Sequence, residues 1–280
     1  MESELRKAVQ EVADAAKSLS ISVVLVGALM SEFASEIEPD YPRFRRTNDA
    51  DFAFNTPDWS AYQKLRETLL GKGFNQNPKI EHRLHLGNAM VDLIPYGPQI
   101  APAGKLVWPD SGFEMTVTGF DEVCAAARKS GESKGAPLWV ITVPGFVLLK
   151  IISYLERKER GDGKHKDDAK DIAYWLNNFA GGSGDERRFG LAAEREYTDQ
   201  DYATAGAVLL GKEVGALASA AAGAYVERFL RESADRYSPF VDMLAAGALD
   251  EAADRRRDEG VALLAAFGKG FRHTRKQHPA

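Results

Sequence analysis

RRTNDADFAF, residues 45–54, is the segment on which the predicted fold depends most. Its alternation of polar and apolar residues predicts a β-strand, on which residues i and i+2 share a face. We therefore expect Asp49 and Asp51 to lie side by side, with the alternate apolar residues in the core. Two carboxylates this close repel each other unless a positive charge neutralises them, and hard oxygen ligands suit Mg²⁺. A solvated strand edge is the alternative that the motif alone leaves open.

A third aspartate, Asp92, lies in a predicted β-hairpin. Residues 82–86 and 89–94 are both typical of strands, and the Gly87-Asn88 link between them favours a two-residue turn. An acid inside the apolar second strand costs free energy unless it is paired, bound to a metal or at an exposed end. Asp92 is therefore the candidate third carboxylate of the site, and a salt bridge or an edge position is the alternative.

A glycine follows the first predicted strand. Residues 21–27 form a continuous apolar run that ends at Gly27, and a helix is expected from Ala28 to about residue 37. A glycine lets a ligand approach the backbone, and a helix start offers N–H groups and a positive dipole to phosphate. Plain packing of helix against strand explains the same pattern without a ligand.

Composition places the chain among ordinary globular proteins. Its 280 residues suffice for one large domain or two modest ones, and the net charge of −5 argues against binding polyanions through bulk charge. One cysteine, Cys124, rules out an intrachain disulfide and fits a cytoplasmic location. The sequence shows neither a signal peptide nor an apolar run of membrane-spanning length, so we expect no membrane association. The scattered histidines make a zinc site improbable.

The remaining pattern predicts a mixed first part and a helical second part. In the first part we expect helices at 2–19, 59–71 and 120–129 and strands at 113–118 and 138–142. After these we expect only helices, at about 144–157, 167–176, 199–210, 212–232, 235–246 and 248–268. The glycine-rich segment 177–190 is the best linker candidate. The basic tail at 272–278 is expected to be disordered, with nucleic-acid contact as the alternative.

The order of these motifs resembles the polymerase-β-type nucleotidyltransferase superfamily. The resemblance depends on the strand ending in Gly27, on Arg45-x-Thr47-x-Asp49-x-Asp51 and on Asp92. Within the superfamily the chain looks most like the bacterial AbiEii/MNT-like branch, which includes toxins of abortive-infection and toxin–antitoxin systems. That branch commonly has a helical lysine, here Lys150, followed by a Lys-Asp-x-x-Asp-like segment, here Lys166 to Asp171. The resemblance covers roughly residues 20–180.

The resemblance implies a fold and roles for individual residues. It implies an α/β (α+β) nucleotidyltransferase core at 1–130, with a small mixed sheet flanked by helices, and an all-α region at 131–280. Asp49 and Asp51 would hold Mg²⁺, or Mn²⁺, on the triphosphate, and Asp92 would complete a second metal site or act as base. The other residues implied in nucleotide binding are Gly27, Ala28, Ser31, Arg45, Thr47, Lys150, Asp168 (or Asp167) and Asp171. The alternative for Lys150 is a lysine that extends along its own helix face. The alternative for the acids is that they cap the start of a helix.

The implied function is metal-dependent transfer of a nucleoside monophosphate from an NTP to an acceptor hydroxyl. The acceptor is left open among tRNA or other RNA, a protein and a small molecule such as an aminoglycoside, and a toxin-type member would pair with an antitoxin protein. Ala28 departs from the family, which usually has Gly-Ser or Gly-Gly at this point. A catalytically weak nucleotide-binding or protein-interaction module is therefore the alternative function.

Overall fold

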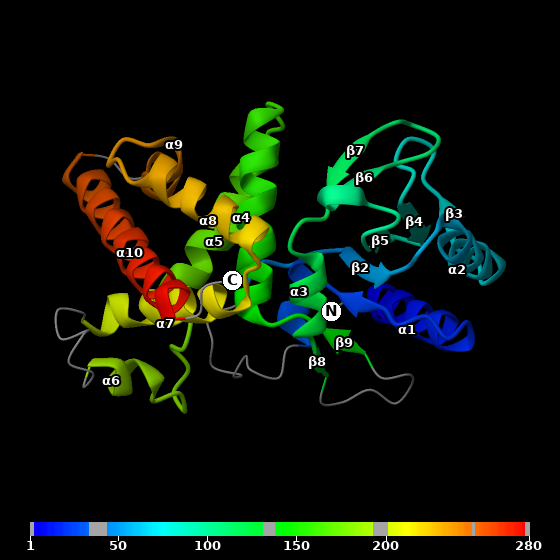
Figure 1. The fold of residues 1–280 in the computed structure, drawn as a ribbon, viewed down its shortest axis with the longest axis horizontal. Coiled ribbons are helices and arrows are strands. Elements are labelled where there is room, and N and C mark those ends of the chain that lie inside the picture. The colour runs from blue at the N-terminus through cyan, green and yellow to red at the C-terminus, as the bar shows by residue number, and fades with distance from the viewer. Residues whose placement is uncertain (1–2, 34–43, 131–137, 193–200, 248–249, 278–280) are drawn as a thin grey trace. The chain divides into compact units, whose positions relative to one another are not determined.

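The computed structural model describes residues 3–33, 44–130, 138–192, 201–247 and 250–277. Their contacts divide into two compact units, the first ending at Thr142 and the second beginning at Val143 (Figure 1). Strand β9, Trp139–Val140, pairs within the first unit, and a domain boundary at 130/131 stays a prediction. None of the described helices is both long enough and apolar enough to cross a membrane.

The first unit combines helices with a mixed sheet, which confirms the predicted fold class. Its helices are α1 (Ser3–Ser18), α2 (Trp59–Gly71) and α3 (Phe120–Ala125), with 3₁₀ turns η1 (Ala28–Glu32) and η2 (Pro102–Gly104). The strands before the central hairpin are β1 (Val24–Leu25), β2 (Asp49–Asn55) and β3 (Asn75–Gln76). The hairpin is β4 (Arg83–Leu86) and β5 (Ala89–Tyr96), and β6 (Lys105–Val107), β7 (Glu114–Thr116), β8 (Arg128–Lys129) and β9 follow.

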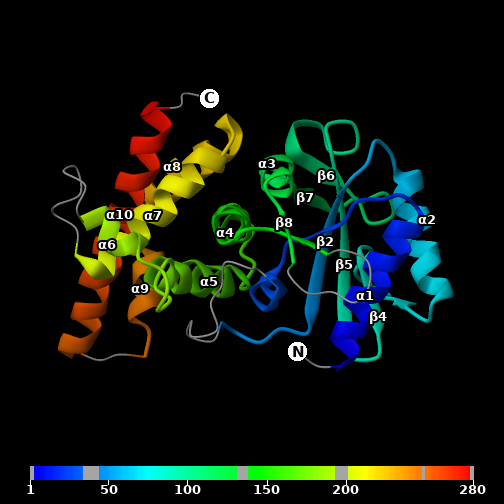
Figure 2. The same ribbon diagram turned by 90° about the horizontal axis from the view of Figure 1, so that it is seen from below.

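The central sheet carries the acidic strands in its middle. Within the described residues its order is β3-β4-β5-β2-β1-β9-β8, while β6 and β7 form a separate pair. Strands β2 and β5 run parallel, as do β1 and β9, and the other neighbours are antiparallel. Helices α1 and α2 lie together on one face of this sheet (Figure 2). Strand β2 therefore has neighbours on both edges, and its register is determined from two sides.

Alternation along β2 separates a buried face from an acidic face. Ala50, Phe52 and Phe54 are fully buried, and the Phe54 ring stacks on Tyr62 of α2 with centroids 6.3 Å apart. Asp49 and Asp51 alternate with these residues, so they lie on the opposite face of the strand, where both are half-buried. The predicted alternation of this stretch is confirmed.

Several predicted elements are shorter in the structure or replaced by others. The strand expected over 21–27 is only Val24–Leu25, and the helix expected from Ala28 is a 3₁₀ turn that ends at Glu32. Residues 34–37 of that expected helix lie outside the described residues. The helix expected over 120–129 ends at Ala125 and gives way to β8, a strand that was not predicted. These segments are too short for periodicity to identify, because pairing with a neighbour decides their conformation.

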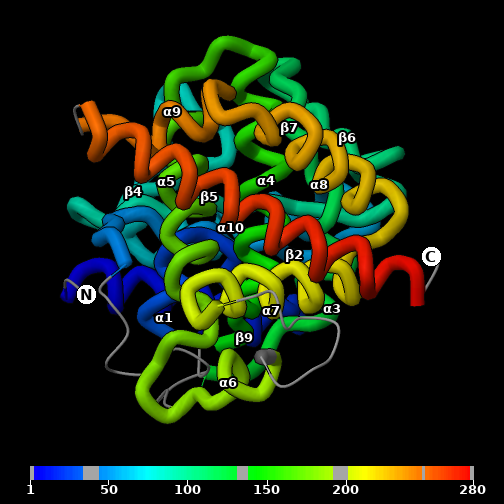
Figure 3. Tube along the Cα trace, turned by 90° about the vertical axis from the view of Figure 1, so that its left-hand side faces the viewer, coloured from blue at the N-terminus to red at the C-terminus, as the bar shows by residue number. Residues whose placement is uncertain are grey.

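Helices alone make up the described part of the second unit. They are α4 (Val143–Glu159), α5 (His165–Asn178), α6 (Arg187–Ala192), α7 (Tyr202–Leu217), α8 (Ala220–Ser233), α9 (Pro239–Ala245) and α10 (Asp250–Gln277). Edge-to-face contacts join Tyr154, Phe229 and Phe240, with centroids 4.9–5.8 Å apart, in a core between α4, α8 and α9. Helix α10 packs along α7 (Figure 3). Their backbones approach so closely that a Cβ on Gly211 would overlap the carbonyl oxygen of Phe267.

Two segments expected to be loose are held by arginines. The predicted linker 177–190 contains the end of α5 and the start of α6, and the buried Arg188 donates hydrogen bonds to the carbonyl oxygens of Asn177 and Phe179 at 2.7–2.9 Å. The tail expected to be disordered from residue 272 is instead helical through Gln277. In it Arg272 pairs with Glu227 at 2.8 Å. The prediction of disorder was wrong because these ion pairs depend on α8, which local composition does not show.

Candidate active site

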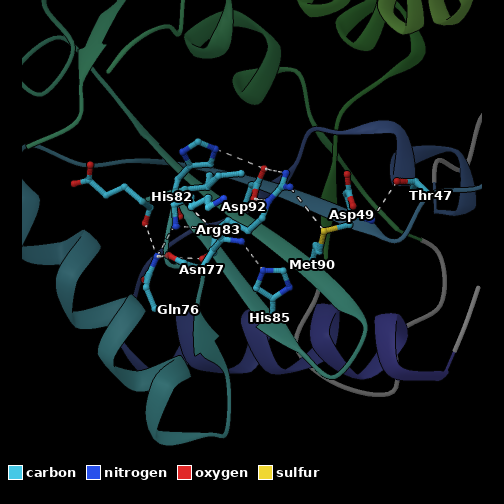
Figure 4. A network of polar contacts seen from close by, with 12 residues as sticks. Thr47, Asp49, Gln76, Asn77, His82, Arg83, His85, Met90 and Asp92 are labelled. Carbon is cyan, nitrogen blue, oxygen red and sulfur yellow. Dashed lines mark hydrogen bonds and ion pairs between the residues drawn. The ribbon is translucent and has the colours of Figure 1, made fainter. Parts of the chain in front are cut away.

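Sheet register brings the three predicted aspartates onto one face. Strands β2 and β5 are parallel, with Asp51 opposite Asp92 and Asp49 opposite Met90. Residues opposite each other in a parallel pair share a face, and neighbouring strands lie about 4.8 Å apart. Asp49, Asp51 and Asp92 therefore form one acidic row across two central strands, and Figure 4 shows Asp49 and Asp92 of this row.

Gly27 makes room for the carboxylate of Asp51. The backbone N–H of Val26 donates to the carbonyl oxygen of Asp51 at 2.8 Å, which holds the end of β1 against β2. A Cβ built on Gly27 would overlap the Asp51 carboxylate. The backbone of Gly27 is extended, with φ −86°, so glycine is required by close approach and not by its conformation. Sequence reasoning assigned this space to a ligand, and the structure places the Asp51 side chain there.

In the turn after Gly27, the Ser31 hydroxyl forms a hydrogen bond within the turn itself. Ala28 is buried, and the Ser31 hydroxyl donates to the carbonyl oxygen of Ala28 at 3.1 Å. The N–H of Met30 donates to the carbonyl oxygen of Gly27 at 2.9 Å. Phosphate binding by Ala28 and Ser31 stays a prediction, and in this structure Ser31 closes the 3₁₀ turn.

Thr47 and Arg45 precede the acidic strand. The Thr47 hydroxyl accepts a hydrogen bond from the backbone N–H of Asp49 at 3.1 Å, which orders the entry into β2. The Arg45 guanidinium lies 5.9 Å from the centroid of the Phe44 ring. Thr47 therefore has a structural role beside Asp49, and nucleotide contact by either residue stays a prediction.

Arg83 is the residue that sequence reasoning missed. Its Nε and Nη2 donate to Oδ1 and Oδ2 of Asp92, both at 2.7 Å (Figure 4). Hydrogen bonding to Asp92 raises the pKa of Arg83 despite burial, and the charges of Asp49 and Asp51 add to the increase. His82 contributes a further cationic group when protonated, with Nε2 3.7 Å from Oδ2 of Asp92. Of the alternatives for Asp92, the structure therefore contains the salt bridge.

The two-residue hairpin turn predicts the pairing of Arg83 with Asp92. Gly87 and Asn88 link β4 to β5, so Leu86 pairs with Ala89. Counting outward from that pair places Arg83 opposite Asp92. A register drawn from the two-residue turn would have identified Arg83 from the sequence alone.

A second charged cluster lies inside the helical unit. Lys150 of α4 contacts Asp168 at 2.8 Å and Asp171 at 2.9 Å, and both aspartates of α5 are buried. Arg157 and Ser153 bind the other oxygen of Asp168 at 2.7 and 3.2 Å. Burial lowers the pKa of Lys150, but attraction by the two aspartates outweighs it and the net shift is upward. The structure thus brings together the predicted Lys150, Asp168 and Asp171, and a role for them in nucleotide binding stays a prediction.

The neighbouring acid of the predicted segment faces solvent. Asp167 pairs with Lys170 at 3.1 Å, and both side chains are more than half exposed. Of the two aspartates that the sequence left open, Asp168 is therefore the one that contacts Lys150.

Two carboxylates of the acidic row, those of Asp49 and Asp51, are suitable ligands for a hard divalent cation. Asp49 and Asp51 are half-buried neighbours, and the Asp51 carboxylate packs against Gly27, where any Cβ would overlap it. The described residues contain no group of three or more His, Cys, Asp or Glu side chains arranged to hold a metal ion. A site built from all three aspartates therefore stays a prediction.

Comparisons with known proteins give structural likenesses. No protein-family model matches the chain, and no curated protein matches its sequence. The antibiotic-resistance factor ANT(2'')-Ia matches in its solution structure with 11% identity and a TM-score of 0.39, over 62% of this chain and 84% of that chain. Its crystal structure in complex with adenylyl-2''-tobramycin matches with 13% identity and a TM-score of 0.39, over 62% and 87%. An antigenic nucleotidyltransferase-like protein from Paracoccidioides brasiliensis matches with 19% identity and a TM-score of 0.40, over 78% and 92%. At these values the functional argument depends on the site alone.

Proposed function

We propose that the chain is a metal-dependent nucleotidyltransferase. The observation that carries this proposal is the pair of half-buried aspartates, Asp49 and Asp51, side by side on a central strand, with the Asp51 carboxylate against Gly27. Two carboxylates plus substrate phosphates are the usual ligand set of Mg²⁺ in enzymes that act on nucleotides. The strand places both carboxylates on one rigid element, which suits a reaction that depends on positioning.

The reaction is displacement at the α-phosphorus of an NTP. An acceptor oxygen forms a bond to that phosphorus, the bond to the bridging oxygen breaks, pyrophosphate leaves with the electron pair, and the acceptor loses its proton. A bound divalent cation supplies positive charge to the phosphate oxygens. Asp49 and Asp51 would hold that cation, the missing side chain of Gly27 makes room for the Asp51 carboxylate, and Thr47 orders the backbone at Asp49.

The finer points of this proposal come from the sequence. The acceptor is RNA, a protein or a small molecule with a hydroxyl group, and a toxin-type role with an antitoxin partner remains part of the proposal. The alternative of a binding module with little turnover is not favoured, because Asp49 and Asp51 lie side by side on one face of a central strand.

Labelled nucleotides test the proposed function. With NTPs labelled at the α-phosphate, offered together with total RNA, tRNA, protein or tobramycin, we expect label to move to one class of acceptor while pyrophosphate is released. Asp49→Asn should lower this transfer by about 100-fold or more, because even outer-shell changes at metal sites cost about 10- to 100-fold. Asp14→Asn, at an exposed position of α1, is the matched control and should transfer as the wild type does. Label that stays on the nucleotide in every mixture, or undiminished transfer by Asp49→Asn, would contradict the proposal.

A further inference from the structure

We infer that Arg83 is a positioning residue that keeps a second metal ion away from Asp92, so that the site takes one divalent cation, at Asp49 and Asp51. This inference rests on the proposed function and specifies how its site is occupied. It also departs from the sequence-based expectation that Asp92 completes a second metal site.

Arg83 and Asp92 form a bidentate ion pair. Arg83 binds Asp92 as a fork, with one nitrogen on each carboxylate oxygen at 2.7 Å. Such bidentate contacts are among the strongest hydrogen bonds in proteins and also fix orientation. The third nitrogen, Nη1, lies 3.7 Å from the sulfur of Met90, so the guanidinium is held on more than one side. Both carboxylate oxygens are therefore engaged by one cation.

The surrounding sheet makes this contact difficult to open. Arg83 and Asp92 are register partners across the antiparallel hairpin, and Asp92 is the register partner of Asp51 on the other side. The Arg83 and Asp92 side chains are only 15% and 8% exposed, so solvent screens their attraction weakly. Separating the two would remove the bidentate partner from a buried carboxylate, which is strongly unfavourable.

The fixed charge determines where a metal can bind. A second cation at Asp92 would share its oxygens with the guanidinium and would be repelled by it. Asp49 and Asp51 lie one strand further from Arg83 and provide the position for the single cation. Arg83 thus supplies, as a permanent part of the protein, positive charge at the place where a second metal would otherwise be needed.

Manganese alone, followed by electron paramagnetic resonance, tests the inference without requiring activity. The wild type should bind one Mn²⁺ per chain. Arg83→Met should bind a second ion, because the guanidinium no longer engages both oxygens of Asp92. The double variant Arg83→Met/Asp92→Asn replaces the ion pair by neutral side chains and should return to one ion, with a Kd within about threefold of the wild type. Arg66→Met removes an arginine that bonds Gln76 on the same sheet and should behave as the wild type does.

The outcomes separate the inference from the proposed function. Two Mn²⁺ ions on the wild type, with one lost in the double variant, would overturn the inference and leave the proposed function intact. A folded Arg83→Met that still binds one ion would also overturn it. Should Arg83→Met fail to fold, the comparison of the wild type with the double variant decides: one ion on both agrees with the inference, and two ions on the wild type with one on the double variant overturn it. A wild type that binds no Mn²⁺ would overturn the inference, and the proposed function would then be decided by the transfer of label from the NTP.

Discussion

Gly27→Ala is expected to lower the rate of nucleotidyl transfer by about 100-fold, because misplacing a catalytic group by about 1 Å can cost that much. The added Cβ would overlap the Asp51 carboxylate, so this side chain must move away from its place beside Asp49. Crowding of this kind also costs about 1–3 kcal/mol of stability. Initial rates of pyrophosphate release and the Kd for Mn²⁺ measure the effect.

Gly71→Ala is the control for this variant. Gly71 is the last residue of α2, and a Cβ there would meet no atom within 4 Å. We expect wild-type rates and a gain of up to about 1 kcal/mol in stability, because alanine loses less conformational entropy than glycine in a helix. Wild-type rates and Mn²⁺ affinity in Gly27→Ala would show that the close approach to Asp51 has no part in function.

Lys150→Met is expected to lower the free energy of unfolding by about 3–5 kcal/mol, since removing one partner of a buried ion pair leaves uncompensated charge. Asp168 and Asp171 would then lie buried, with only Arg157 to balance Asp168. The pKa of Lys150 is raised in the folded state, so its contribution is fully present below the ordinary lysine pKa of about 10.4 and is lost as pH rises beyond it. The difference from the wild type should therefore be constant between about pH 6 and pH 9.

Lys170→Met provides the matched control on the same helix. Lys170 pairs with Asp167 at the surface, where 72% and 60% of the two side chains are exposed. Such pairs contribute about 0–1 kcal/mol, so urea unfolding of this variant should resemble the wild type. A stable Lys150→Met that has lost only nucleotide affinity would contradict the structural role and support the phosphate contact expected from the sequence.

Sequence reasoning succeeded where a local pattern determines the structure. The alternation around Asp49 and Asp51 predicted both the strand and its accessible face, and the Gly87-Asn88 turn predicted the hairpin that carries Asp92. Helix α2 has the predicted bounds because Asp58 caps it, accepting a hydrogen bond from the N–H of Ser60 at 2.8 Å. In each case neighbouring residues contain the cause.

Sequence reasoning failed where the cause lies in a distant segment. Strand β1 is short because its register with β2 covers only Val24 and Leu25, and Asp51 of β2 fills the space beside Gly27. The partner of Asp92 lies nine residues earlier, and only the hairpin register connects the two. The tail was expected to be disordered, but Arg275 donates a hydrogen bond to the carbonyl oxygen of Ala218, 57 residues away. Contacts of this kind do not appear in composition or periodicity.

The central claim is that Asp49 and Asp51 hold a metal–nucleotide complex, and thermal melting tests it most directly. The wild type and the Asp49→Asn/Asp51→Asn variant would be melted with each of the four NTPs, with and without Mg²⁺. One NTP should stabilise the wild type only with Mg²⁺, by about 2.7 kcal/mol at 100 times its Kd, and should leave the double variant unchanged. Equal stabilisation of both proteins, or of neither by any NTP, would contradict the claim.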